Sequence, residues 1–481
     1  MKEIKLFIIG MLAIIAQSGL ISCSGNDGLL LESPNSFDES KLEISSILNT
    51  RSSLISPDSY LVSFEDAKNI SRSLYPNSDF KIEPYVIDRD TLLYLVNYKK
   101  GWVIIAGDKR INPIVAESDK GSISKWSSNE NLMTWIDSYA DEIHAIRTDS
   151  MEIENEYTKL WSIISPIKTK NSKQTRSSVE YKWAVVSNTY CDSETSSVLI
   201  PHLVSTKWGQ GYPWNTKLPI DTSDSGNRCP TGCVAVALSQ IVYYMHYHLS
   251  KPTALYHNIS IGSTSISGKT QNIGFVRANL NSNSTRWNDM ALHMYSTGNI
   301  SYVGDLMLDM GNRLGMKYSG SGSSADISSS AMSYYNLSYS QSTFNYSLVK
   351  TDLLNSKPVN VTAYRKVDGS SNKKGHSWII DGIGTKTRHY VTSKHFEYTE
   401  NWMYESEYYD TFDELRTHYH INSEYDYIEE DAGYYTSEYL FMNWGYDGDN
   451  DNGYFSTYPS TPWTYYNRIY NYDKVINYDF R

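Results

Sequence analysis

The sequence contains very little cysteine, with four in 481 residues. One of them, Cys23, lies near the start, and the other three are Cys191, Cys229 and Cys233. Three thiols are too few for a disulfide framework or a structural zinc site in a chain of this length. Cys191 and Cys229 could pair, and Cys229 could form a regulatory disulfide with Cys233, although a plain second thiol at Cys229 is the preferred account. The fold must therefore depend on its hydrophobic core.

Excess basic charge and long apolar runs are also missing. Lys and Arg number 43 against 54 acidic residues, which gives a net charge of −11 without a basic cluster. This balance argues against a nucleic-acid partner. After the N-terminal segment no apolar run reaches the length of a membrane span. Residues 447–453 superficially resemble a calcium loop, but their glycine falls one place late and Tyr458 stands where a bidentate Glu is needed, so we predict neither a metal site nor a cofactor.

The first residues have the pattern of a targeting segment. A basic start precedes an apolar stretch from Leu6 to Ile15, which is too short for a lasting membrane span. The tetrapeptide ending at Cys23 resembles a bacterial lipobox. We therefore predict a lipoprotein signal peptide at residues 1–22 and a lipid on Cys23 that anchors an exported protein to the bacterial outer membrane or cell surface. Ordinary secretory cleavage near Ser22 or Ser24, which releases the protein, is the alternative.

The rest of the chain divides by composition. Residues 23–56 lack periodicity and suit a tether. Residues 57–165 predict a compact α+β unit, with a helix from residue 64, strands at 91–98, 101–108 and 114–118, and a helix at 131–147. Residues 166–180 are polar and basic without large apolar side chains, which predicts an exposed, protease-sensitive linker. Residues 181–481 then form the larger part.

The stretch from Cys229 to Gln240 is the most informative part of the chain. A small-residue turn precedes Cys233, and the apolar residues after it fall at helical spacing. A thiol at a helix N-terminus lies beside free backbone N–H groups and the positive end of the helix dipole, which favours the nucleophilic thiolate. Considered alone, Cys233 is better interpreted as a buried structural cysteine, and the later segments reverse that preference.

Two later segments provide the groups that a thiolate needs. His376 precedes a short apolar run closed by Asp381-Gly, which is typical of a buried strand, and Asn443 and Trp444 end a second strand-like run. An Asn carbonyl can orient the imidazole of a catalytic histidine, and Trp444 could shield that hydrogen bond from water. The order Cys, His, Asn, with the Cys opening a helix, matches the papain-type arrangement.

Residues 208–215, 231–237, 375–382 and 443–446 resemble the streptopain family of secreted bacterial cysteine proteases, peptidase family C10. The resemblance implies an α+β fold in which a papain-like domain, with a helical part and an antiparallel sheet part, follows a small α+β pro-domain. It implies Cys233 as nucleophile, His376 as general base and acid, and Asn443 and Trp444 as supports of the histidine. The pro-domain of such a protein blocks the active site until it is cleaved away; an independent interaction domain is the alternative.

Two further features of the site follow from the same resemblance. Gln210 is the candidate side chain of an oxyanion hole, together with the backbone N–H of Cys233, although it could instead satisfy backbone groups of its own turn. The Gly-rich run 318–324 resembles a family loop that lines the substrate cleft, which makes Ser321, Gly322 and Ser323 candidates for substrate binding. A flexible surface loop is the other interpretation.

One departure from the family concerns the spacing of His376 and Asn443. In compact relatives a short hairpin joins their strands, whereas 67 positions separate them here. We expect an insertion at about 386–434, rich in Tyr and acidic residues, that extends from the hairpin end, since loop-closure cost grows slowly with length. Substrate choice then need not follow the family.

The combined prediction is an exported cysteine endopeptidase made as a zymogen. Its partners are protein or peptide substrates, its own pro-domain as intramolecular inhibitor, and the membrane through the N-terminal lipid. Two alternatives stay open. One is a catalytically weak surface protein that binds ligands through the Tyr-rich half, and the other is an amidase or transglutaminase with the same triad.

Overall fold

This computed structural model describes residues 60–148, 157–164, 180–221, 227–247, 264–266, 269–271, 285–366, 373–401, 403–404, 406–448, 453–457, 463–465, 468–470 and 474–481. Within these ranges no helix is both long and apolar enough to cross a bilayer. The predicted signal peptide, Cys23, the tether at 23–56 and residues 166–179 of the linker lie outside the described residues.

The N-terminal unit has the helices and strands that the sequence predicts and two further elements that it did not predict. Its elements are α1 (Phe64–Leu74), β1 (Phe80–Ile87), β2 (Asp90–Tyr98), β3 (Trp102–Ala106), β4 (Ile114–Ser118), α2 (Glu130–Thr148) and α3 (Thr158–Ile164), and the two further ones are β1 and α3. Helix α1 begins where the hydroxyl of Ser63 accepts from the Asp66 N–H while the Asp66 carboxylate accepts from the Ser63 N–H. This capping box satisfies backbone donors that the first turn leaves open.

The C-terminal unit combines helices with long strands. Its elements are β5 (Tyr181–Ile200), β6 (Ile220–Asp221), β7 (Asn227–Arg228), α4 (Cys233–Tyr247), β8 (Thr264–Ile266), β9 (Lys269–Gln271), α5 (Thr285–Asn288), α6 (Ile300–Leu314), α7 (Ser329–Ser333), β10 (Ser340–Thr343), α8 (Tyr346–Leu354), β11 (Val359–Lys366), β12 (Lys373–Glu400), β13 (Tyr408–Tyr409), α9 (Phe412–Tyr419), β14 (Ile428–Asn443), β15 (Tyr454–Ser456), β16 (Trp463–Tyr465), β17 (Arg468–Tyr470) and β18 (Val475–Tyr478). The fold is therefore α+β, as predicted.

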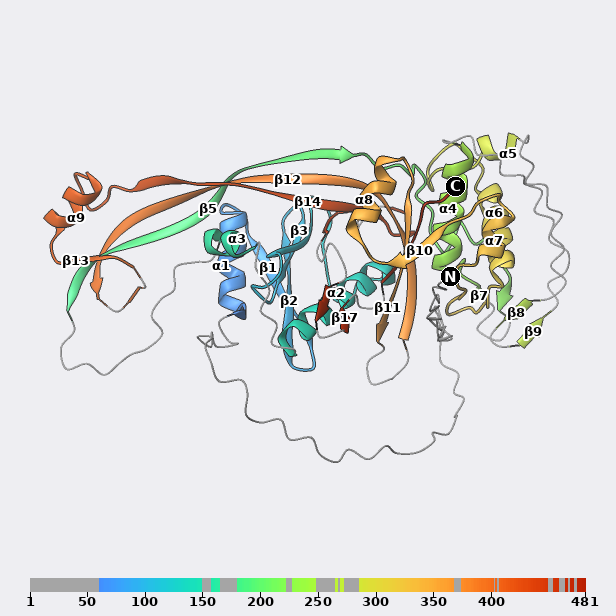
Figure 1. Cartoon of the computed structure of the whole chain (residues 1–481), viewed down its shortest axis with the longest axis horizontal. Coiled ribbons are helices and arrows are strands. Elements are labelled where there is room, and N and C mark those ends of the chain that lie inside the picture. Colours follow the sequence, from blue (N-terminus) through green and yellow to red (C-terminus); the bar gives the residue numbers. More distant parts are fainter. Residues whose placement is uncertain are drawn as a thin grey trace, which may run out of the picture.

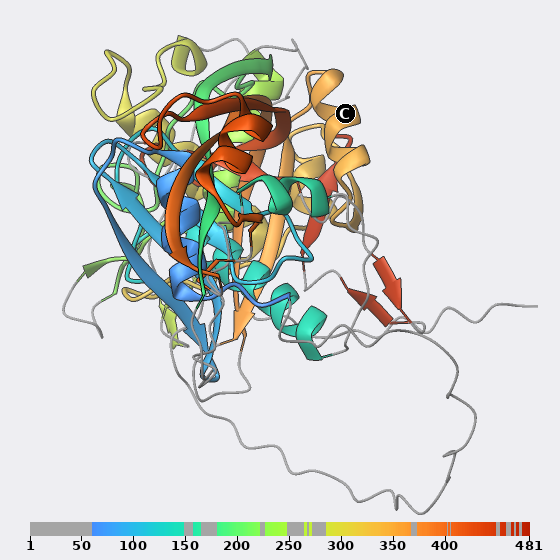
Figure 2. The same ribbon diagram turned by 90° about the vertical axis from the view of Figure 1, so that its left-hand side faces the viewer.

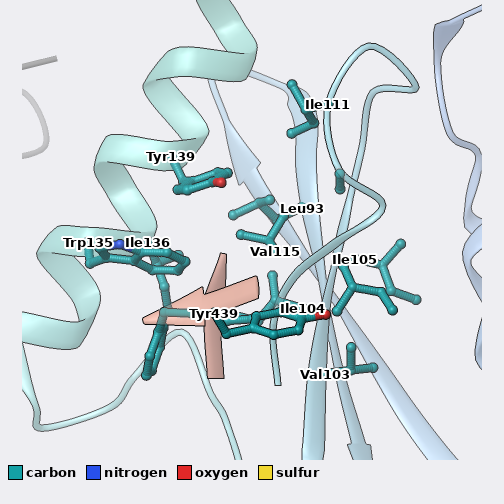
Figure 3. Packing of buried hydrophobic residues seen from close by; sticks show 14 of the residues in the cluster. Leu93, Val103, Ile104, Ile105, Ile111, Val115, Trp135, Ile136, Tyr139 and Tyr439 are labelled. Atoms are coloured by element: carbon teal, nitrogen blue, oxygen red, sulfur yellow. The ribbon is translucent and has the colours of Figure 1, made fainter. Parts of the chain in front are cut away.

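One antiparallel sheet runs through both units, which the sequence did not predict. Its order is β1-β2-β3-β4-β15-β14-β12-β11-β18-β10, and β4 of the N-terminal unit pairs with β15 of the C-terminal unit. The largest core cluster likewise takes residues from both units. Figure 3 shows Tyr439 of β14 beside Ile104 and Ile105 of β3, with Trp135 of α2 close by. The two units share one core instead of meeting as separate globules.

A second core cluster surrounds α4, α6 and α7, which gather at one end of the molecule (Figure 1). Helix α4 is apolar on almost every side, and all its residues from Cys233 to Met245 are buried. Such a helix is stable only inside a protein core. The helical part and the sheet part thus have separate interiors, and α4 packs against β12 at their boundary.

Residues 386–434, where the sequence predicts an insertion, form a long arm together with the part of β5 that pairs with them. We use the name arm for residues 386–434 and residues 181–196 of β5. Strands β5 and β14 flank β12 over most of its length. At the tip, Val185, Phe396, Leu415 and Ile421 form a small core of their own. Figure 1 shows the arm extending over the N-terminal unit, and Figure 2 shows its tip facing the viewer.

The expectation that Asp381-Gly closes the first catalytic strand is wrong, because β12 continues to Glu400. The pairing with β14 shifts by one residue between Ile380 and Gly382, which marks a β-bulge at Asp381. A Cβ at Gly382 would lie 2.8 Å from the carbonyl oxygen of Ile200, so glycine lets β5 approach here. The Asp-Gly pair bends the strand and does not end it.

Candidate active site

Cys233 occupies the first position of α4 and is only 2% exposed. The residue before it, Gly232, has φ of +90°, and a Cβ there would approach Ser323 O and the Met316 side chain at about 3 Å. Only glycine adopts this conformation in so little space. The small-residue turn seen in the sequence therefore fixes where the helix begins and where its first thiol lies.

The segments that carry Gln210 and Ser323 both lie against this turn. The Gln210 carbonyl accepts from the backbone N–H of Thr231 at 2.9 Å and from its hydroxyl at 3.2 Å. The Ser323 carbonyl faces Gly232, and Ser323 is buried, whereas Gly322 is half-buried and Ser321 is exposed. The structure thus brings both predicted binding segments to the start of α4.

His376 lies on β12, opposite Ala363 of β11, and its side chain is 1% exposed. Its Nε2 atom lies 3.4 Å from Oε2 of Glu130, the first residue of α2. The next residue of α2, Asn131, donates from its side-chain amide to the carbonyls of Ser377 and Trp444. The N-terminus of α2 therefore sits directly on the segment that contains the predicted catalytic histidine.

Asn443 lies on β14 in register with Ile379 of the neighbouring strand β12, as expected for adjacent strands. Its amide Nδ2 donates to Thr206 O at 2.8 Å and to Gln240 Oε1 at 3.2 Å. Its Oδ1 accepts from Gln240 Nε2 at 3.3 Å and from Gly445 N at 3.2 Å. Both ends of the amide are engaged by these groups, and the hydrogen bond to His376 that the sequence led us to expect is not among them.

The alternation of side chains along β12 explains this arrangement. His376 and Trp378 share one face of the strand, and Ile379 lies on the other. Trp378 belongs to the core cluster shared with the N-terminal unit, whereas Ile379, the partner of Asn443, belongs to the cluster around α4. In this form of the chain the imidazole is directed to the α2 side of the sheet.

Trp444 is buried and lies on the shared-core side of the site. Its ring is 5.2 Å from that of Trp378 and 5.0 Å from that of Phe455. Its carbonyl accepts the hydrogen bond from Asn131. The tryptophan therefore links β14, β12 and β15 beneath the N-terminus of α2.

None of the three described cysteines forms a disulfide, and all three are buried. Cys191 lies on β5 in the shared core cluster, while Cys229 and Cys233 lie in the cluster around α4. Neither a Cys191–Cys229 pair nor a Cys229–Cys233 pair forms in this structure. Burial raises the pKa of the Cys191 thiol to about 11, which makes it a poor nucleophile at neutral pH.

Gln240 is the residue at the site that the sequence analysis missed. It is fully buried, and besides Asn443 its Oε1 accepts from the Thr206 hydroxyl at 2.9 Å and from Trp208 N at 3.3 Å. A signal was present, because Gln240 is a polar residue in an otherwise apolar helix and lies seven positions after Cys233, on nearly the same face. Glu130 and Asn131 carried no comparable signal.

Comparison with known proteins places this geometry in a class. The family model of the peptidase C10 family matches residues 208–455, just over half of the chain, and this range includes Cys233, His376 and Asn443. The protein is a cysteine peptidase, and the chain belongs to the peptidase C10 family. The model of the Spi protease inhibitor family matches residues 64–143, which identifies the N-terminal unit as a pro-domain.

Several individual proteins are similar to parts of this chain. Streptopain of Streptococcus pyogenes serotype M28 is 23% identical over 326 residues, which cover 62% of this chain and 70% of streptopain. The thiol protease/hemagglutinin PrtT of Porphyromonas gingivalis is 27% identical over 163 residues, or 33% of this chain and 16% of that protein. A prointerpain A fragment of Prevotella intermedia aligns over 83% of this chain and 98% of its own, with 17% identity and a TM-score of 0.46.

Proposed function

We propose that the protein is an exported endopeptidase, made as a zymogen, in which Cys233 is the nucleophile and His376 the general base and acid. The observation that carries this proposal is that a cysteine is the first residue of α4 and a histidine lies on β12, the strand against which α4 packs. Both residues lie within the part of the chain that matches the peptidase family. The substrates are protein chains.

In the proposed reaction the Cys233 thiolate attacks the carbonyl carbon of the scissile peptide bond. His376 then gives its proton to the leaving amine, which breaks the C–N bond and leaves an acyl-enzyme. Water, deprotonated by His376, attacks the thioester and releases the acid product and the thiol. The Cys233 backbone N–H and Gln210 stabilise the oxyanion in both steps, which is supported by the position of Gln210 against the turn before Cys233.

The contacts of α2 support inhibition by the pro-domain. Glu130 and Asn131 bind the His376–Ser377 segment and the Trp444 carbonyl, so substrate cannot occupy the same space. They also hold the imidazole on the face of β12 opposite to Asn443. We infer that removal of the pro-domain frees the segment around His376 to complete the site with Cys233, Asn443 and Trp444.

The test uses the full-length precursor and an unstructured protein substrate. The intact precursor should be inactive, and cleavage within about residues 168–178 followed by loss of the pro-domain should release activity that iodoacetamide abolishes. Cys233→Ala should remove all hydrolysis, and His376→Ala should lower kcat by several orders of magnitude. Activity of the processed Cys233→Ala protein would refute the assignment, and full activity of the uncut chain would refute the zymogen.

Two variants examine the blocking contact itself. Glu130→Gln combined with Asn131→Ala should raise the basal activity of the uncut precursor. Glu65→Gln, on an exposed part of α1 in the same unit, is the matched control and should not. The transglutaminase alternative predicts that an added primary amine is incorporated into the product, whereas the endopeptidase predicts hydrolysis alone. Export through a lipid on Cys23 predicts metabolic labelling by palmitate that Cys23→Ser abolishes.

A further inference from the structure

Glu117 of the pro-domain is fully buried between two cations of the arm. Its Oε2 lies 3.3 Å from Lys386 Nζ and 2.5 Å from Arg388 Nη2, and both cations are on β12 and almost completely buried. Glu194 of β5 meets the same pair from the other side, at 2.9 Å from Lys386 Nζ and 2.5 Å from Arg388 Nη2. Asp119 adds a contact to Lys386 at 3.1 Å from a more exposed position. The cations thus sit in a closely fitted carboxylate site.

The backbone around Glu117 binds as an added strand. In the pairing of β4 with β15, Glu117 lies opposite Tyr454 and Ala116 opposite Phe455. Within the described residues, the C-terminal unit pairs nothing else with this side of β15. The pro-domain therefore occupies a sheet edge in the way that a peptide bound by strand addition does, with one acidic side chain as its anchor.

Loss of the pro-domain leaves this site with unbalanced charge. Glu117 and Asp119 leave with β4, so Lys386 and Arg388 keep only the Glu194 carboxylate. Two cations near a low-dielectric sheet with one anion between them attract another carboxylate strongly. Loss of β4 also leaves the backbone N–H and C=O groups on one edge of β15 without their strand partner. An incoming peptide can therefore pair with β15 and place a carboxylate between Lys386 and Arg388.

We propose that in the processed enzyme Lys386, Arg388 and the edge of β15 form an exosite for protein substrates, which takes an extended segment carrying one acidic side chain. The site rests on the proposed function, because it needs the pro-domain to leave. The location of the exosite favours a substrate as its occupant. Phe455 of β15 contacts Trp444, so a segment paired with β15 lies next to one of the candidate catalytic residues. A chain held there presents its neighbouring residues to the cleft.

The surrounding charge makes the exosite selective. Residues 386–434 contain twelve acidic and four basic residues, so the arm as a whole repels acidic chains. Two of the four basic residues are Lys386 and Arg388 at its root. An acidic side chain is therefore attracted only where strand pairing brings it into register with these two, as Glu117 is now.

The test uses a peptide with the sequence of residues 111–120 and the same peptide with Glu117→Gln. The enzyme is processed from full-length precursor, and for binding measurements its Cys233 is alkylated. The acidic peptide should bind about thirtyfold or more tighter than the Gln peptide. It should also slow cleavage of a long protein substrate without affecting hydrolysis of a short peptide. In Arg388→Gln the discrimination between the two peptides should disappear, and in Lys394→Gln, farther out on the same strand, it should persist.

Equal affinities of the two peptides for the unmutated enzyme would overturn the exosite even if Arg388→Gln failed to fold. Competition of the acidic peptide with the short substrate would also overturn it, because the peptide would then occupy the cleft. Hydrolysis of the short peptide separates the two proposals. If it continues in the Cys233→Ala enzyme, the proposed function fails; if it depends on Cys233 while the peptides bind alike, only the exosite fails.

Discussion

Cys233 and Cys229 are both buried thiols of the cluster around α4, yet only Cys233 opens a helix. We predict that iodoacetamide at neutral pH labels none of the three described cysteines quickly in the precursor. After processing, Cys233 should be labelled at least tenfold faster than Cys229, because the helix N-terminus favours its thiolate and the pro-domain no longer covers the site. Peptide mass spectrometry measures both rates. Equal labelling of the two thiols after processing would contradict the assignment of Cys233.

Gln240 joins three parts of the site and should matter for both stability and rate. Gln240→Leu leaves the Asn443 amide, the Thr206 hydroxyl and the Trp208 N–H without their present partner. Each buried polar group without a hydrogen bond costs about 1–3 kcal/mol, so the free energy of unfolding should fall by at least that amount. The catalytic rate should fall as well, because Asn443 and the segment from Thr206 to Gln210 lose their common support.

Urea unfolding of the Cys233→Ala form measures the stability without self-digestion. Ser239→Ala, at the neighbouring buried position of the same helix, is the matched control and should have a much smaller effect. If Gln240→Leu unfolds like Ser239→Ala, the hydrogen-bond network around Asn443 carries little free energy, and the positioning role of Gln240 is wrong.

At the residue scale the sequence was informative about the position of Cys233 at the start of a helix and less so about its surroundings. Gly232 and Cys233 could be placed because a turn of small residues before a helix needs only local geometry. The contacts of Asn443 could not, because they depend on Gln240 and Thr206, which are remote in sequence from β14. The contact of Glu130 with His376 depends on how the two units pack together, and a local sequence pattern cannot predict that packing.

Among the secondary-structure elements, the arm carries a titratable group that joins its three strands. His389 of β12 lies 3.3 Å from Asp192 of β5 and 3.1 Å from Asp431 of β14, and its ring stacks on Tyr434. The hydrogen bond to Asp192, supported by Asp431, raises the pKa of His389 above its usual value near 6.5. The protonated ring therefore stabilises the arm fully below that value, and the effect is lost as the pH rises through the raised pKa.

We predict that protection of the arm backbone against hydrogen exchange, corrected for the intrinsic rate, decreases as the pH rises above the usual histidine pKa near 6.5. The change should be confined to peptides near residues 187–194 and 428–434. His389→Gln should remove the pH dependence and show weak protection throughout. An identical pH dependence in His389→Gln would show that another group controls the arm.

The elements of the arm illustrate what local sequence does not reveal. The apolar run after His376 was recognised as a strand, but the polar continuation of β12 to Glu400 was not. Those residues lack a clear alternation because much of the arm is solvated, and their extended form is set by pairing with β5 and β14. The helices of the pro-domain were easier to predict, since capping and amphipathic spacing are local.

On the scale of the whole molecule, buried charge holds the two units together. Burial alone would raise the pKa of Glu117, but Arg388 and Lys386 outweigh it and lower the pKa to about 2. Because the pKa is depressed in the folded state, the stabilisation is present above the ordinary Glu value near 4.5 and is lost only as the pH falls toward 2. A second buried pair, Lys474 with Glu142 at 2.8 Å, crosses the same boundary, but there burial outweighs the lysine and raises the pKa of Glu142.

We therefore predict that the precursor cut only in its linker keeps its pro-domain at pH 4 and stays inactive there. Glu117→Gln leaves buried cations short of an anion, which should weaken the association by about 3–5 kcal/mol. Gel filtration of the cut Cys233→Ala protein measures the loss. Asp119→Asn, at a largely exposed partner of Lys386, is the control and should remain associated. Release of the unmutated pro-domain already at pH 5 would contradict the role of Glu117.

The single sheet formed by strands of both units could not be predicted from the sequence. The pairing of β4 with β15 joins positions more than 300 residues apart, and each strand alone is only a short run. The sequence around Tyr439 predicts an ordinary strand residue. Its burial among pro-domain residues is visible only in the structure (Figure 3). Composition predicted two units, but it did not predict the hydrophobic core that they share.

The direction of β5 has a consequence for the life of the processed enzyme. Tyr181 pairs with Glu400 far out on the arm, and the strand then returns toward the body as far as Ile200. A cut at residues 168–178 leaves a new amino terminus that is only a few residues before Tyr181 in the chain. An aminopeptidase that shortens it would strip β5 from β12 progressively, and the catalytic cleft would be reached last. Aged preparations with shortened amino termini should therefore have a partly unpaired arm, while their rate of short-peptide hydrolysis is unchanged.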